Sequence, residues 1–140
     1  MADAVLSSLL RIDRQRRRYI RSALLPYQYV GAMHLIVLYL RRNPGASQEE
    51  IACHYALDKT GVARDARRLE DMGHIRREIV PADRRQYQIY LTEAGAAMGP
   101  VLDGIYDSFL RRISAGMSPE DWETLRRLLQ KLEESSAADR

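Results

Sequence analysis

The sequence predicts a mainly α-helical chain with about six helices and one β-hairpin. Apolar residues recur at three- and four-residue spacing on both sides of residues 75–91, which is typical of amphipathic helices. Within residues 75–91 the pattern changes to a period of two around a polar turn, which indicates a hairpin. A length of 140 residues suits one compact chain and leaves no room for a separate large catalytic domain.

Two helices are expected before residue 43. The first runs from Val5 to Leu24, with apolar residues at positions 5, 9, 12, 20 and 23 or 24, and Pro26 ends it. A second helical run begins after Tyr27 and reaches the turn signal Asn43-Pro44-Gly45. Its apolar stripe is expected to contain Val30, Met33, Val37 and Leu40.

A short helix and a basic helix follow in close succession. Ser47 and Glu50 form a capping-box pattern that opens a helix reaching about Tyr55. Asp58 is expected to cap the next helix, which runs from Lys59 to about Met72 and closes at Gly73. Its inward residues are Val62, Ala66 and Leu69. Its outward face is basic and presents Lys59, Thr60, Ala63, Arg64 and Arg67.

The hairpin comes next, with strands at 75–80 and 86–91 and a polar turn at 81–85. A long helix then begins at Thr92, has an irregularity at Gly99-Pro100 and ends at Gly116. Ser118-Pro119 opens a last helix before a polar tail at 135–140. The apolar stripes of these two helices are Met98, Leu102, Ile105, Phe109 and Ile113, and Trp122, Leu125, Leu129 and Leu132.

Composition excludes several classes of protein. The longest apolar stretch is too short for a membrane span, and the N-terminus lacks a signal-peptide pattern, so a cytoplasmic location without membrane contact is expected. Hydrolase and nucleotide-binding motifs are absent, and the three histidines lack metal-ligand spacing. We therefore expect no enzyme activity, no cofactor and no metal. Cys53 is expected to be a buried structural cysteine rather than a redox or metal-binding residue.

The order of elements is that of a winged helix-turn-helix. All basic residues except Lys59 and Lys131 are Arg, the side chain whose planar fork suits phosphates and base edges. A helix fits the DNA major groove, so the basic face of 59–72 is a candidate for contact with the duplex. The hairpin tip would hold Arg84 and Arg85 over the neighbouring minor groove.

The residues from Asp83-Arg84-Arg85 to Leu91-Thr92-Glu93-Ala94-Gly95, with Arg68 to Ile75 upstream, resemble the wing region of the MarR family of regulators. The resemblance covers nearly the whole chain, 1–140. It implies a homodimer built by helices at 1–25 and 95–136, around a winged lobe at 28–94 with its helix-turn-helix at 47–72 and wing at 75–92. It further implies a repressor of palindromic operators in double-stranded DNA that a small aromatic or anionic effector releases.

By the same resemblance, Arg85 enters the minor groove and Asp83 holds the wing arginines in place. The alternative is a surface ion pair worth ~0 to 1 kcal/mol. The resemblance places an effector near Arg16, Met33, His34 and Tyr106. For Arg16, which lies on the apolar stripe of the first helix, the alternatives are an interhelical salt bridge or a snorkelling side chain. For Met33 and Tyr106 the alternative is packing.

A second functional class also fits the pattern. The chain could be a helical dimeric adaptor whose winged domain binds another protein, with the basic run from Arg14 to Arg21 facing an acidic partner. Salt dependence separates the two classes. Binding to a duplex weakens steeply as salt rises, whereas an apolar protein interface hardly responds.

Overall fold

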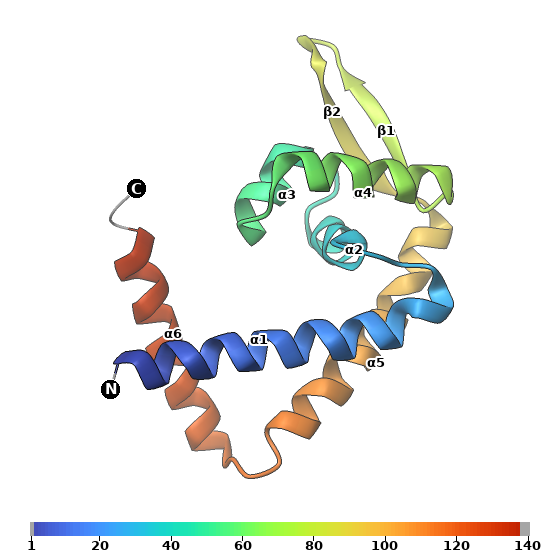
Figure 1. Ribbon diagram of the computed structural model, residues 1–140. Helices are drawn as coiled ribbons and strands as arrows, with labels where there is room; N and C mark the ends of the chain where they lie inside the picture. The colour runs from blue at the N-terminus through green and yellow to red at the C-terminus, as the bar shows by residue number, and fades with distance from the viewer. Residues whose placement is uncertain (1, 138–140) are drawn as a thin grey trace. The chain divides into compact units, whose positions relative to one another are not determined.

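The computed structural model describes the backbone of residues 2–137 and the side chains of residues 3–83 and 86–137. Its elements are helices and one hairpin (Figure 1), namely α1 (Ala2–Leu24), the 3-10 turn η1 (Leu25–Tyr27), α2 (Met33–Arg42), α3 (Gln48–Tyr55), α4 (Lys59–Asp71), β1 (Ile75–Val80), β2 (Asp83–Leu91), α5 (Glu93–Ile113) and α6 (Pro119–Ala137). The predicted mainly α fold with about six helices and one hairpin is confirmed. The chain divides into two compact units, one up to Tyr106 and one from Asp107.

The first unit is built around α4, which contacts α2, α3 and β1. The side chains that meet in this core are almost fully buried and come from every surrounding element. They include Ile36 and Leu40 of α2, Ile51 of α3, Val62 and Leu69 of α4, Ile89 of β2 and Leu102 of α5. Burial of such side chains contributes about 1.5 to 3 kcal/mol each, so this shared core determines how the elements of the unit pack.

The predicted starts of α3 and α4 are confirmed by their caps. The Ser47 hydroxyl accepts the Glu50 N–H at 3.1 Å, and the Asp58 carboxylate accepts the Gly61 N–H at 3.0 Å. Each cap satisfies a backbone donor that has no partner inside its helix. At the other end of α4, Gly73 has φ +78°. This conformation suits glycine at a helix C-terminus.

The second helix begins later than the sequence predicts. Gln28 has φ +59° and Gly31 has φ +53°, so the chain turns twice before α2 starts at Met33. Left-handed residues cannot continue an α-helix, and the predicted place of Val30 in the apolar stripe is wrong. Tyr29 is buried instead, and Val30 is exposed. Within α2 the buried stripe consists of Met33, Ile36, Val37 and Leu40, with His34 beside it.

The hairpin differs from the prediction at its tip. The predicted five-residue turn is wrong, because β2 already begins at Asp83, which pairs with Val80. Ile79 pairs with Tyr87, so the residues between Asp83 and Tyr87 form a bulge in β2. The polar composition of this stretch, which lacks an apolar alternation, made it resemble a turn.

A third strand of minimal length was not predicted. Ala46, between α2 and α3, forms an isolated antiparallel bridge with Ile89. The Gly45 N–H donates to the Ile89 carbonyl at 2.9 Å, and the Ile89 N–H donates to the Ala46 carbonyl at 3.0 Å. This bridge ties the base of the wing to the start of the helix-turn-helix. Because one residue makes the bridge, the sequence there shows no period-two pattern that would predict a strand.

Two details of the last helices also differ. α5 runs from Glu93 to Ile113 with Pro100 inside it, so the expected irregularity at Gly99-Pro100 does not break the helix. Met98 and Leu102 are buried on both sides of Pro100, and this packing holds the helix together. α6 extends to Ala137, which makes the first residues of the predicted polar tail helical.

Both ends of the chain expose apolar side chains. On α1 they are Val5, Leu6, Leu9, Leu10 and Ile12. On α6, in the second unit, they are Trp122, Leu125, Leu128, Leu129 and Leu132. In the portion that the structure describes, no helix is long and apolar enough to cross a membrane.

Gly95 offers a test of the packing between α5 and the wing. A Cβ at Gly95 would lie 2.0 Å from the His74 carbonyl oxygen, whereas one at Gly104 would meet nothing within 4 Å. Gly95→Ala should therefore lower the free energy of unfolding by about 1 to 3 kcal/mol. Gly104→Ala, the control on the same helix, should raise it by about 0.5 to 1 kcal/mol. Urea unfolding at one protein concentration measures both, and equal effects would contradict the described packing.

Candidate nucleic-acid interface

The outward face of α4 is positioned by its buried face. Val62, Ala66 and Leu69 are buried, as predicted. The helix therefore turns its other side to solvent, where Lys59, Thr60, Arg64 and Arg67 are exposed and Ala63 is half-buried. The exposed carboxylates of α4 are Glu70 and Asp71, both at its C-terminal end, so the rest of this face is basic. Such a face can donate hydrogen bonds to phosphates and base edges.

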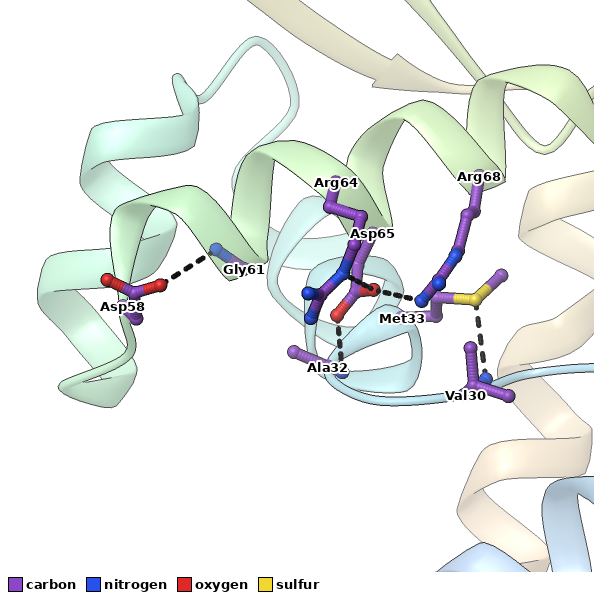
Figure 2. A network of polar contacts seen from close by, with 8 residues as sticks. All are labelled: Val30, Ala32, Met33, Asp58, Gly61, Arg64, Asp65 and Arg68. Carbon is purple, nitrogen blue, oxygen red and sulfur yellow. Dashed lines mark hydrogen bonds and ion pairs between the residues drawn. The ribbon is translucent and has the colours of Figure 1, made fainter.

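One residue that sequence reasoning missed lies within this helix. Asp65 is only 2% exposed, although it is a carboxylate on a basic helix. Figure 2 shows that it contacts Ala32, Arg64 and Arg68. The signal was its spacing: Asp65 follows Val62 by three residues and precedes Leu69 by four, so it lies on the predicted inward stripe.

The wing is fixed by arginines that the sequence reading did not single out. The Arg76 guanidinium lies 4.5 Å from the centre of the Tyr90 ring and pairs with Glu78. Arg77 Nε lies 3.3 Å from Glu70 Oε2 on α4, which links β1 to that helix. The contacts of Arg76 lie within the hairpin, whereas the pair of Arg77 with Glu70 fixes the hairpin relative to α4.

The wing tip carries three further predicted residues. Asp83 is exposed, at the start of β2. The side chains of Arg84 and Arg85 lie outside the described residues, and only their backbone is placed, in the bulge of β2. The expected roles of these residues at the minor groove stay predictions.

The residues expected near an effector come from three helices. The Tyr106 hydroxyl on α5 lies 2.8 Å from His34 Nδ1 on α2. Arg16 on α1 lies close enough that its charge lowers the pKa of both groups. The ion pair of Arg16 is with Asp13 of the same helix, at 2.9 Å, and not with another helix. Met33 is almost fully buried, and its sulfur accepts the Val30 N–H at 3.3 Å.

Burial sets the protonation of this cluster. Burial first, and then the positive charge of Arg16, lowers the pKa of His34 to about 4, while Asp65 opposes the shift. Burial also raises the pKa of Tyr106 to about 12. Near pH 7 the imidazole and the phenol are therefore neutral, and Arg16 supplies the positive charge beside them. Its side chain is about one-third exposed, so an anion could reach it.

Cys53 is exposed on α3, so the expectation of a buried cysteine is wrong. The buried residues of this helix are Ile51 and Ala52. Successive residues of a helix point about 100° apart, so Cys53 points away from the side that Ala52 buries. Among the residues that the structure describes, no three His, Cys, Asp or Glu side chains are close enough together to hold a metal ion.

Comparison with known proteins agrees with this arrangement. Residues 32–87, from the start of α2 into β2, match the model of the MarR family. This part of the chain is similar to the MarR family. A curated relative is the HTH-type transcriptional regulator BilQ of Clostridioides difficile (strain CD3), which is 22% identical over 114 residues, 81% of this chain and 77% of that protein.

Solved structures share the fold of this chain. A MarR transcriptional regulator from Methanosarcina mazei Go1 is 22% identical with a TM-score of 0.90, and the match covers 99% of both chains. A mutant of MarR from E. coli, complexed with operator DNA, is 21% identical with a TM-score of 0.79, covering 91% of this chain and 92% of that one. The winged helix-turn-helix predicted from the order of elements is therefore confirmed as the fold.

The buried histidine makes stability depend on pH. The pKa of His34 is about 4 in the folded chain and about 6.5 in the unfolded chain, so the unfolded chain binds more protons between these values. The free energy of unfolding should fall as the pH drops through this window, by up to about 3 kcal/mol. Urea unfolding at about pH 7 and about pH 5 measures the effect.

The His34→Gln variant should lose this component of the pH dependence. His54→Gln, a change of an exposed histidine on α3, is the control and should keep it. A pH dependence that is the same in wild type and His34→Gln would show that His34 titrates normally in the folded chain.

Proposed function

We propose that this chain is a dimeric, sequence-specific DNA-binding transcription regulator of the MarR family that represses palindromic operators. The observation that carries the proposal is the exposed basic face of α4, held outward by the burial of Val62, Ala66 and Leu69. A protein of similar fold has been crystallised with operator DNA. Transcription regulation of this kind requires no catalytic step.

The proposed contact with DNA uses two grooves. α4 would enter the major groove, where Lys59, Thr60, Ala63, Arg64 and Arg67 meet phosphates and base edges. The wing would place Arg84 and Arg85 at the adjacent minor groove, with Asp83 orienting them. The pair of Arg77 with Glu70 supports this, because it links the hairpin to α4.

The proposed dimer uses the two ends of the chain. The exposed apolar side chains of α1 and α6, within 1–25 and 95–136, are more than a monomer normally leaves in water. A second copy that covers them would remove this surface from solvent. The shared helices would then hold two α4 helices about 34 to 36 Å apart, which is one turn of the duplex.

The proposed effector is a small aromatic acid that binds at Arg16, His34 and Tyr106. The guanidinium can pair with a carboxylate, while the neutral imidazole and phenol offer hydrogen bonds and ring contacts. These three side chains come from α1, α2 and α5, so a ligand among them would act on helices that connect the dimer region to the lobe. Met33 has a packing role in this proposal, because it is buried in the core.

Release of DNA would follow from differential affinity. The acid would bind more tightly to the dimer with the lobe separation of the free protein than to the dimer with the lobe separation that fits DNA. It would therefore shift the equilibrium toward the DNA-free dimer.

The first test is selection of genomic duplex fragments by the wild-type protein, followed by affinity measurements at two salt concentrations. Wild type should retain palindromic fragments with two protomers per duplex, and should lose about 10³-fold or more in affinity between about 50 and 200 mM salt. Arg64→Ala should weaken binding by about 10- to 100-fold, because a base or phosphate contact is lost. Arg127→Ala, an exposed arginine on α6, is the control and should bind within about twofold of wild type.

The opposite outcome of this selection is equally clear. If no fragment is preferred at either salt concentration and Arg64→Ala is neutral, the DNA-binding proposal is wrong, and the adaptor function with a protein partner takes its place.

The effector is tested with 2-hydroxybenzoate as the probe. At saturation it should weaken operator binding by at least about tenfold. Arg16→Gln should lower the affinity of the protein for 2-hydroxybenzoate by about tenfold, since the carboxylate loses its charged partner. Arg14→Gln, two residues away on α1 and exposed, is the matched control. If neither this acid nor related aromatic acids change the DNA affinity, the effector part of the proposal is wrong.

A further inference from the structure

The Asp65 carboxylate is buried under the basic face of α4 and has three partners. Its Oδ2 accepts the Ala32 N–H at 2.8 Å. Its Oδ1 accepts a hydrogen bond from Arg68 Nη1 at 3.0 Å and lies 3.7 Å from Arg64 Nε. Figure 2 shows the carboxylate between the two arginines of its own helix and the start of α2.

The bond to Ala32 acts as a helix cap supplied by another helix. Ala32 is the N-cap of α2 and has no side chain that could satisfy the first N–H groups. A carboxylate at this end also interacts favourably with the positive end of the α2 dipole. Asp65 thereby joins α4 to the first turn of α2.

The chain makes room for this carboxylate at Gly31. This residue has φ +53°, and a Cβ there would lie 2.5 Å from Asp65 Oδ2. Any larger residue would strain the backbone and push the carboxylate away. Gly31 and Asp65 therefore form a matched pair at the contact between α4 and α2.

The arginines gain a fixed orientation from the same group. A buried carboxylate is costly unless charged donors compensate it, and here Arg64 and Arg68 do so. The side chains of Arg64 and Arg68 are nevertheless 61% and 47% exposed. Because the Nε edge of Arg64 faces Asp65, its two terminal nitrogens are left for an external acceptor.

We propose that Asp65 is a positioning residue for operator recognition, which holds Arg64 in the orientation that contacts the duplex. The inference rests on the proposed DNA-binding function. It has a signature that a purely structural role lacks. Asp65 also adds a negative charge beneath the basic face, so its loss should weaken binding to the operator but not the electrostatic binding to unrelated DNA.

The test compares Asp65→Asn with wild type on two duplexes: the palindromic fragment recovered by selection and a scrambled duplex of equal length and composition. Asn keeps the shape and can still accept the Ala32 N–H, but it lacks the charge that holds the guanidinium groups. The ratio of operator to scrambled affinity should fall by about tenfold, with scrambled binding unchanged or stronger. Asp71→Asn, a change of an exposed carboxylate at the end of α4, is the matched control.

A double-mutant cycle with Arg64→Ala shows whether Asp65 acts through Arg64. In that background Asp65→Asn should change operator affinity by less than about twofold. Asp65→Ser, a smaller neutral residue, is measured in parallel, so that a folding failure of one variant leaves the other to decide.

The outcomes separate this inference from the function on which it rests. If wild type prefers no fragment, the DNA-binding function itself is wrong. If wild type binds its operator but the neutral variants keep its affinity ratio within about twofold, or their effects add to that of Arg64→Ala, the positioning role of Asp65 is overturned.

Discussion

The packing of α4 against α2 is the contact on which the other features of the first unit depend. Val62, Ala66 and Leu69 bury one side of α4, and Asp65 adds a polar contact to the start of α2 on the same side. Because one side of α4 is buried, the residues on its opposite side remain exposed to solvent. The basic face of α4 is thus a consequence of core packing.

Other elements are attached to this pair of helices through polar contacts, some half-buried and one exposed. Tyr106 of α5 meets His34 of α2, and Arg41 of α2 pairs with Asp103 of α5 at 2.9 Å. Tyr29 meets His74, at the start of the wing, with 2.6 Å between the hydroxyl and Nδ1. Such contacts are directional, so they define the relative orientation of the joined elements more sharply than apolar packing alone. An effector at Arg16, His34 and Tyr106 would act on one of these contacts.

The elements were largely predictable because their signals are local. Ser47 and Asp58 cap helices through bonds to residues three positions away, and such patterns are visible in the sequence. The late start of α2 and the bulge of β2 were not predictable in the same way. The late start of α2 depends on residues with a left-handed backbone, such as Gln28, and a non-glycine residue rarely adopts this conformation. The bulge of β2 depends on its pairing with β1.

By itself, the sequence determined the helical class, the order of elements and the basic face of α4, since each follows from the spacing of residues within one segment. The MarR-like pattern of the wing was also readable there. Only the tertiary structure decided that Asp65 is buried against Ala32, that Cys53 is exposed, and that Arg16 lies near His34 and Tyr106. These facts depend on contacts between segments far apart in the chain, whose geometry is set by the shared core and not by local spacing.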